Sequence, residues 1–159
     1  MESQTSVVRH AGEGKAVWSM GQLQQQKLIG DESGGELTVI EIVQPAGVAT
    51  PLHIHPGESE AFYILEGHMS YQAGDDVHEL IAGSFVYLPR GVPHAFRVRE
   101  QVRILAIVVP SGIELLYETV GRPADDLVLP PAPEQEEIQR WVTEAIAGGM
   151  QIVGAPIPE

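Results

Sequence analysis

Short apolar runs separated by glycine or proline are the feature that most constrains how this chain can fold. The runs are four to eight residues long, which is the length of a β-strand and too short for most helices. They occupy residues 17–20, 22–28, 36–43, 60–65, 69–72, 78–81, 84–88, 94–98 and 102–109. Many short strands joined by turn residues predict an all-β barrel or sandwich.

The pattern changes to a helical period after Pro110. Apolar residues recur at intervals of three and four over 113–120 and again over 138–146, which predicts two amphipathic helices. The second helix is preceded by glutamates that favour the positive end of a helix dipole, and Gly148 follows it. A stiff, proline-rich connector at 129–133 separates the two stripes. We expect these helices to pack on the outside of the barrel.

The composition excludes several classes of function. The 159 residues suit one domain, and 22 acidic against nine basic residues give a formal net charge of −13. Such a surface repels phosphate backbones and anionic lipids, so we expect neither a nucleic-acid partner nor a membrane partner. With no cysteine there is no disulfide and no thiolate ligand. The sequence shows no signal peptide and no apolar run of about 20 residues, so we expect a cytoplasmic protein.

Three histidines and a glutamate stand in frames rich in glycine and proline: His53, His55, Glu60 and His94. On an extended strand, residues i and i+2 point to the same face, so His53 and His55 can present two imidazoles to one ion. Buried imidazoles and a carboxylate on one face would carry a large desolvation cost unless a cation paired them. We therefore interpret these four residues as metal ligands. The remaining histidines, which we interpret as ordinary surface or core residues, are His10, His68 and His78.

Three neutral imidazoles and one carboxylate accept several divalent transition metals. The set suits Fe, Mn, Co, Ni, Cu or Zn, and the sequence does not choose among them. Four protein ligands leave one or two coordination positions for water, substrate or dioxygen, which is the pattern of a catalytic site. Glu60 is the ligand most able to change role, because it could leave the metal and take a proton from a substrate hydroxyl.

The frames around these residues match two known signature motifs. The first is Gly, five residues, His-x-His, four residues, Glu, six residues, Gly, and it runs from Gly47 to Gly67. The second is Gly, five residues, Pro-x-Gly, two residues, His, and it runs from Gly83 to His94. The chain thereby resembles the cupin superfamily. The asparagine that usually closes the second motif is replaced by Val98.

This resemblance implies a fold and its division along the chain. It implies an all-β cupin barrel, a double-stranded β-helix or jelly roll, with a C-terminal helical extension. We expect strands in 1–34 to pack on a barrel core at 35–110 that holds the metal site, followed by a helical segment at 111–159, all within one domain. The resemblance also allows the helical segment to act as a lid over the barrel mouth.

Stretches outside the motifs are similar to the small single-domain cupins called quercetin 2,3-dioxygenase-like. They include residues 30–36, 51–56, 62–67, 88–96 and 110–114. This similarity implies a ring-opening dioxygenase that acts on a flavonol or related enol, with Glu60 as the base. Dimers are common among similar cupins, so we expect a homodimer by analogy.

A barrel of this size leaves room inside for one small organic ligand beside the metal. Strand parity places Phe62 and Ile64 on the face of Glu60, and Phe96 on the face of His94. These three residues are the expected pocket wall.

Two alternatives to a dioxygenase stay open. One is a non-redox lyase, isomerase or cyclase with the ion as Lewis acid, and the other is a small-molecule-binding cupin without catalysis.

Overall fold

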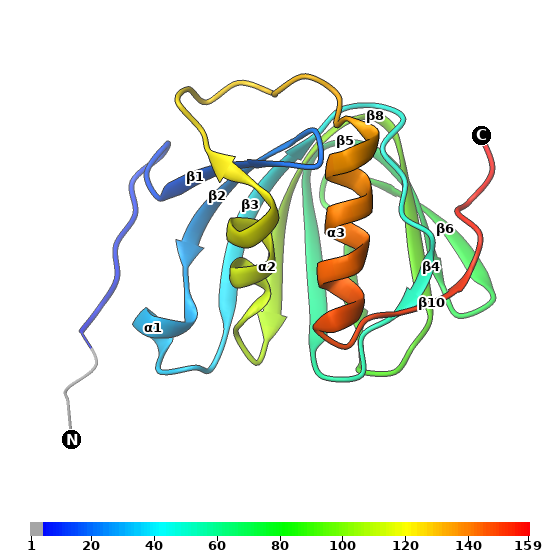
Figure 1. Ribbon diagram of the computed structural model, residues 1–159, viewed down its shortest axis with the longest axis horizontal. Helices are drawn as coiled ribbons and strands as arrows, with labels where there is room; N and C mark the ends of the chain where they lie inside the picture. Colours follow the sequence, from blue (N-terminus) through cyan, green and yellow to red (C-terminus); the bar gives the residue numbers. More distant parts are fainter. Residues whose placement is uncertain (1–4) are drawn as a thin grey trace.

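A strongly curved antiparallel sheet forms a barrel, and two helices lie against one side of it (Figure 1). The computed structural model describes residues 5–159. The strands are β1 (Lys15–Ser19), β2 (Gln22–Leu28), β3 (Thr38–Gln44), β4 (Leu52–Ile54), β5 (Ser59–Ala73), β6 (Asp76–Ile81), β7 (Phe85–Leu88), β8 (His94–Val109), β9 (Arg122–Pro123) and β10 (Gln151–Gly154). The helices are α1 (Gly30–Ser33), α2 (Ile113–Val120) and α3 (Gln135–Ala147). The predicted β class with C-terminal helices is confirmed.

Two long strands, β5 and β8, organise the sheet. They pair with each other along almost their whole length, although the sequence pattern predicts two short strands in place of each. The break in the pattern is a bulged bend at Gly67, where φ is 89°. A Cβ at this position would lie 2.0 Å from the carbonyl oxygen of Gln101, so only glycine fits. Gly67, which the sequence pattern predicts to lie in a turn, therefore lies inside the continuous strand β5 and bends it.

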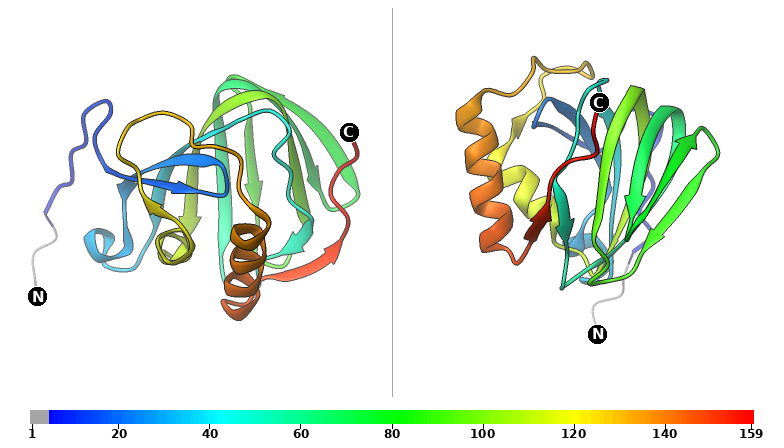
Figure 2. Two further views of the ribbon diagram at one scale, coloured as in Figure 1. Left: turned by 45° about the horizontal axis from the view of Figure 1, so that its top comes forward. Right: turned by 90° about the vertical axis from the view of Figure 1, so that its right-hand side faces the viewer.

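Strand β8 pairs with three other strands, β3, β4 and β5, and so joins the two halves of the barrel. Its C-terminal part pairs with β3, and β2, β1 and β9 continue the sheet from there. Its first residue pairs with β4, whose other edge pairs with β10. Strand β5 also pairs with β6 and β7. Figure 2 shows the two halves wrapped around a common interior.

The N-terminal strands belong to the same sheet as the barrel. Leu23 in β2 lies opposite Val43 in β3, and β1 pairs with β2 over its full length. These strands fall in the segment 1–34, of which residues 1–4 lie outside the described residues. The short helix α1 follows β2 and carries no apolar period, so the sequence pattern does not predict it.

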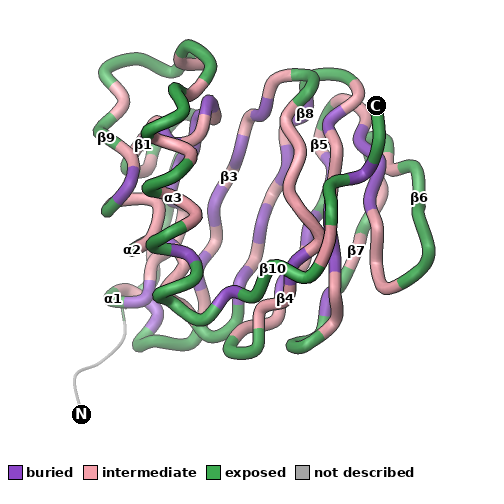
Figure 3. The backbone as a smooth tube through the Cα atoms, turned by 45° about the vertical axis from the view of Figure 1, so that its right-hand side comes forward, coloured by how far each residue is buried: buried purple, intermediate pink, exposed green. Residues whose placement is uncertain are grey.

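The core fills the space between the two halves of the barrel. Every second residue of β3 is buried, from Thr38 through Ile40 and Ile42 to Gln44. Figure 3 shows buried positions running along the inner strands, whereas β6 is exposed along most of its length. The buried cluster comprises Ile40, Ile42, Phe62, Ile64, Met69, Tyr71, Leu88, Val98, Val102, Ile104 and Ala106.

A buried carboxylate fixes α2 to the barrel. The side chain of Glu114 accepts hydrogen bonds from Gly30 N at 2.8 Å, Thr38 Oγ1 at 2.5 Å and Gly112 N at 2.9 Å. Burial acts to raise the pKa of Glu114, but the hydrogen bonds from Thr38 and from the backbone lower it below its ordinary value. An ionised, fully bonded Glu114 therefore holds the start of α2 against β3.

Helix α3 is attached at its first turn. Glu137 Oε1 accepts a hydrogen bond from Met20 N, in the turn between β1 and β2, at 2.7 Å. The other end of α3 leads through Gly148 and Gly149 into β10. Among residues 5–159, no helix has both the length and the apolar character that crossing a membrane requires.

Candidate metal site

The three motif histidines meet at one point in the barrel. His53 lies in β4, His55 directly follows β4, and His94 begins β8. One ring nitrogen from each of these histidines lies within 4.8 Å of the other two. The structure thus brings together the residues that the spacing predicts to be neighbours.

Strand pairing explains this convergence. His53 and His94 are direct partners in the β4–β8 ladder, and their ring centroids are 4.2 Å apart. His55 is two residues after His53, and its ring centroid lies 4.9 Å from that of His53 and 5.3 Å from that of His94. The alternation of side chains along a strand therefore places both His53 and His55 beside the His94 ring.

Glu60 adds a carboxylate to the same cluster. Its Oε2 lies 3.2 Å from His94 Nε2, and its Oε1 lies 3.8 Å from His55 Nε2. Glu60 is buried near the start of β5 and pairs with Val108 of β8. All four residues expected to bind a metal thus face one another.

Backbone carbonyls set the orientation of two of the rings. His53 Nδ1 lies 2.8 Å from Pro51 O, and His94 Nδ1 lies 2.9 Å from Val92 O. A carbonyl oxygen only accepts hydrogen bonds, so Nδ1 carries the proton in both rings. Each neutral ring therefore presents the lone pair of Nε2 to the centre of the cluster, as metal-binding histidines do.

A carboxylate orients the third ring. His55 Nδ1 lies 2.9 Å from Glu58 Oε1, and an ionised carboxylate accepts this hydrogen bond. The Nε2 of His55 is consequently directed at Glu60 and the other two rings. Glu58 was absent from the residues predicted from the sequence. The only signal for it is a glutamate three residues after a candidate ligand.

The donor atoms fit a metal ion. His94 Nε2 is buried, and within residues 5–159 it has no aligned hydrogen-bond partner despite its short distance to Glu60. A buried lone pair without a donor is costly unless a cation takes it. Three imidazole nitrogens and one carboxylate oxygen are a set of ligand atoms that transition metals accept. The residues present could therefore hold one metal ion.

Burial and neighbouring charges shift the pKa values of three residues in the cluster. Burial and the neighbouring His94 ring lower the pKa of His53 to about 4, so this ring is neutral at neutral pH. Burial acts to lower the pKa of His55 as well, but its hydrogen bond to Glu58 and the charge of Glu60 raise it. Burial acts to raise the pKa of Glu60, but His94 and His55 lower it, so Glu60 is ionised.

The cluster lies in the wall of an inner cavity of about 180 Å³. Phe62 and Phe96 line this cavity, as strand parity predicts. Ile64 does not line it, although it shares the face of Glu60. It is fully buried in the core four residues further along β5 than Glu60.

Both C-terminal helices close the inner cavity. Ile113, Leu116 and Tyr117 of α2 and Ile138, Trp141 and Val142 of α3 line it. The apolar stripes of the two helices therefore cover the interior beside the cluster of histidines and Glu60, rather than packing only on the outer surface of the barrel. Tyr117 and Trp141 were not predicted as site residues. The helical stripes were the signal for them, but a stripe alone does not say what it covers.

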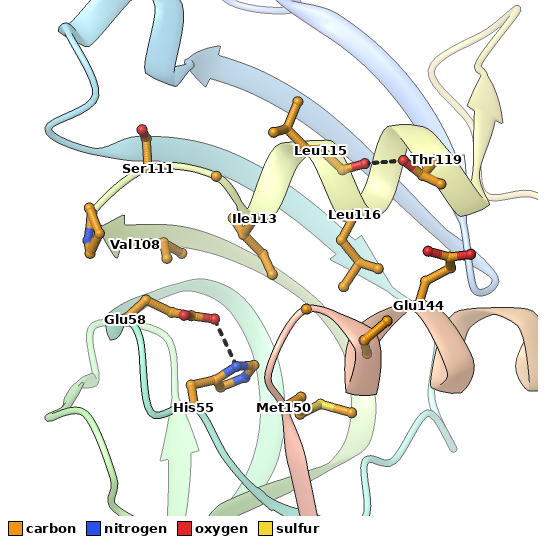
Figure 4. Close-up of a pocket in the computed structure, with 15 residues that line it drawn as sticks. His55, Glu58, Val108, Ser111, Ile113, Leu115, Leu116, Thr119, Glu144 and Met150 are labelled. Atoms are coloured by element: carbon orange, nitrogen blue, oxygen red, sulfur yellow. Dashed lines mark hydrogen bonds and ion pairs between the residues drawn. The ribbon is translucent and has the colours of Figure 1, made fainter.

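An outer groove of about 490 Å³ adjoins the inner cavity. It lies between α2, the end of α3 and the loop that carries His55 and Glu58 (Figure 4). His55 and Leu116 line both spaces, so the groove and the inner cavity lie on two sides of the same residues.

The other histidines take no part in the cluster. His68 Nε2 lies 2.5 Å from Glu79 Oε2, on the paired strands β5 and β6. His10 and His78 are exposed.

Val98 replaces the asparagine of the second motif, and its backbone both accepts and donates a hydrogen bond. Gly47 N donates to Val98 O at 2.9 Å, and Val98 N donates to Val48 O at 2.8 Å.

Comparisons with known proteins agree with this geometry. Residues 39–109 match the family described as Cupin domain. The chain is 25% identical over 138 residues to a quercetin 2,3-dioxygenase of Bacillus subtilis, which covers 86% of this chain and 41% of the relative. It is 32% identical over 84 residues to a dimethylsulfoniopropionate lyase of Ruegeria pomeroyi, which covers 52% of this chain and 41% of the relative. The chain thus spans less than half the length of these two curated relatives.

A solved structure shows the same fold. The crystal structure of an ectoine synthase from P. lautus is similar with a TM-score of 0.61 at 18% identity, over 82% of this chain and 97% of that one. The motif residues, the barrel and these matches lead to one conclusion: the chain contains a cupin domain, which the family model matches over residues 39–109.

Proposed function

We propose that this chain is a metal-dependent dioxygenase that acts on a flavonol or related enolic aromatic at the site formed by His53, His55, Glu60 and His94. The observation that carries the proposal is the convergence of three Nε2 lone pairs and one carboxylate at the wall of an apolar cavity. A divalent transition metal bound there would supply Lewis acidity and, if redox-active, activation of dioxygen. The match to a quercetin 2,3-dioxygenase supports this chemistry.

Glu60 is the base in this proposal. The lowered pKa of Glu60 keeps it ionised at neutral pH, so it is able to accept a proton from a substrate hydroxyl. Its Oε2 is 3.2 Å from His94 Nε2, which places the accepted proton beside the atoms that hold the metal. A metal ion held by His53, His55, Glu60 and His94 would stabilise the negative charge of the deprotonated substrate oxygen.

The cavity walls orient the substrate and exclude water. Phe62 and Phe96 supply aromatic faces from the barrel, and Tyr117 and Trp141 close the cavity from the helices. Apolar walls strengthen the electrostatic interactions at the proposed metal site, because fewer water molecules screen them. The outer groove beside His55 supplies the route by which substrate enters.

Dioxygen consumption tests this proposal. The protein is reconstituted separately with Fe(II), Mn(II), Co(II), Ni(II) and Cu(II), and uptake is followed with quercetin as substrate. Uptake that depends on the metal and disappears in His53→Ala would support a dioxygenase. Absence of uptake with every metal, despite confirmed loading, would contradict it.

A non-redox reaction is the second candidate, because the chain also matches a protein whose name describes a lyase. Here Glu60 again moves the proton, and no dioxygen is consumed. Turnover of a substrate by the Zn(II) protein under anaerobic conditions would favour this alternative over the dioxygenase.

We also propose that the chain forms a homodimer through the outer face of β5 and β7. Phe85 and Tyr87 of β7 are 60% and 58% exposed, and Tyr63 of β5 lies directly opposite Phe85 and is 44% exposed. Neighbouring exposed aromatic side chains on a sheet face are typical of a surface that another molecule covers.

A further inference from the structure

Two side chains that line the inner cavity each carry a buried polar atom without a hydrogen-bond partner among residues 5–159. Gln44, the last residue of β3, points inward and is only 2% exposed. Within residues 5–159, its Oε1 and the Nε1 of Trp141 in α3 are both buried without a hydrogen bond. Both residues line the same cavity as the metal cluster.

Gln44 lies at the end of the cavity remote from Glu60. Val108 of β8 pairs with Glu60 on one side and with Thr38, the first residue of β3, on the other. Gln44 is at the opposite end of β3, where it pairs with Val102. The inward residues between these ends are Ile40 and Ile42, so the part of the cavity wall that β3 supplies changes from apolar to polar toward Gln44.

Trp141 belongs to the same end of the cavity as Gln44. Glu137, one helical turn before Trp141, accepts a hydrogen bond from Met20 N in the β1–β2 turn. Leu23, the second residue of β2, pairs with Val43, the residue before Gln44, at the end of the β2–β3 ladder. Figure 1 shows the first turns of α3 beside the β1–β2 turn. The β1–β2 turn therefore lies near both Gln44 and Trp141.

An unpaired buried polar group destabilises a protein, and an apolar side chain of similar shape avoids this cost. A leucine at position 44 would continue the apolar alternation of Ile40 and Ile42. A glutamine there, together with the free indole N–H of Trp141, supplies both an acceptor and a donor to whatever occupies the cavity.

We propose that Gln44 and Trp141 form a second anchor, which binds a polar group of the substrate at the end opposite the metal cluster. This inference rests on the proposed function, because it assumes that the other end of the substrate meets His53, His55, Glu60 and His94. The cavity of about 180 Å³ compares with an engineered cavity of about 150 Å³ that holds benzene. The part of the substrate inside the inner cavity is therefore one ring with a short substituent that ends in a hydroxyl or carbonyl group.

Two matched catechols test the second anchor. 4-(2-Hydroxyethyl)catechol and 4-ethylcatechol differ only by a terminal hydroxyl, and their two ring hydroxyls can bind at the metal cluster. Binding is measured by calorimetry to the Zn(II)-loaded protein, so that no turnover interferes. We expect the wild type to prefer the hydroxyethyl compound by about tenfold, the effect of one hydrogen bond to an otherwise unpaired buried group.

The variants Gln44→Leu and Trp141→Phe should reduce this preference, measured as the ratio of the two affinities within each variant, to about twofold or less. Gln25→Leu is the matched control. Its amide in β2 donates to Gly12 O at 2.8 Å and does not line the cavity, so the tenfold preference should remain.

Several outcomes would overturn the anchor. They are equal affinity of the wild type for the two catechols, a preference that survives both Gln44→Leu and Trp141→Phe, and no binding of either compound. A lower melting temperature in Gln44→Leu than in the wild type would also overturn it, because it would show that the amide has a structural partner. Failure of the proposed dioxygenase appears separately, as absent dioxygen uptake by a protein that still shows the binding preference.

Discussion

Glu60 Oε2 lies 3.2 Å from His94 Nε2, although the two residues come from different strands and the contact is not aligned as a hydrogen bond. Each atom instead faces the centre of the cluster that His53 and His55 complete. This arrangement is the basis for the proposal that Glu60 and His94 share a cation and that Glu60 takes a proton from the substrate.

Replacement of Glu60 by Gln should remove turnover and leave the fold intact. The amide keeps the size of the side chain but neither accepts a substrate proton nor carries the charge, so the rate should fall by at least about 100-fold. Initial rates of substrate loss and far-ultraviolet circular dichroism measure the two effects. Glu66→Gln, an exposed glutamate on the same strand, should behave as the wild type. An unchanged rate in Glu60→Gln would remove Glu60 from its proposed role.

The metal-free protein should lose stability as the pH falls from about 6.5 to about 4. The pKa of His53 is lowered to about 4 in the folded protein, from 6.5 in the unfolded chain. Between these values the unfolded chain binds a proton that the folded protein does not, so acid favours unfolding, by about 3 kcal/mol in total. The raised pKa of His55 acts in the opposite direction, because its contribution to stability is lost as the pH rises.

Urea unfolding at a series of pH values isolates the contribution of His53. In His53→Gln, the loss of stability between pH 6.5 and 4 should shrink, whereas His10→Gln, at an exposed position outside the cluster, should keep it. The same dependence in His53→Gln and the wild type would show that another group is responsible.

Replacement of Glu114 by Ala should destabilise the protein by about 3 kcal/mol. The change leaves Gly30 N, Thr38 Oγ1 and Gly112 N without their acceptor in a buried position. Urea unfolding measures the loss. Glu136→Ala, an exposed position in the first turn of α3, should change stability by less than about 1 kcal/mol. A loss in Glu114→Ala as small as that in the control would contradict the role of Glu114 as the anchor of α2.

Replacement of Phe85 by Lys should convert the proposed dimer into a monomer. A charge at the centre of the exposed aromatic face is costly to bury against a second copy. Light scattering measures the mass. Val77→Lys, an exposed position on the neighbouring strand β6, is the control, and it should keep the mass of two chains. A wild-type mass equal to one chain would contradict the homodimer.

The sequence predicts the metal cluster because local geometry determines it. Alternation along β4 places His53 and His55 together, and the glycine-framed spacing brings Glu60 and His94 to neighbouring strands. The same alternation predicts Phe62 and Phe96 as cavity residues. Ile64 shares the face of Glu60 but is fully buried in the core, because parity gives the face of a strand and not the depth at which the cavity ends.

Contacts between distant segments are what the sequence could not predict. A glutamate near the start of a helix, such as Glu114, usually lies in solvent, and its burial depends on Thr38 and Gly30 of an earlier segment. Gln44 continues an apolar alternation as a polar residue, and only the assembled barrel shows it facing a cavity. Short strands such as β10 exist because an edge of the barrel is available to pair with them, and not because of their own pattern.

Metal content after equilibrium dialysis tests the central claim most directly. The wild-type protein, stripped with a chelator and dialysed against Co(II) or Zn(II), should retain one ion per chain at pH 7.5 by elemental analysis. His53→Ala should retain much less than one ion under the same conditions, whereas His78→Ala, at an exposed position on β6, should retain one. Equal metal content in the wild type and His53→Ala, or no retained metal in the wild type, would contradict the assignment of this cluster as the metal site.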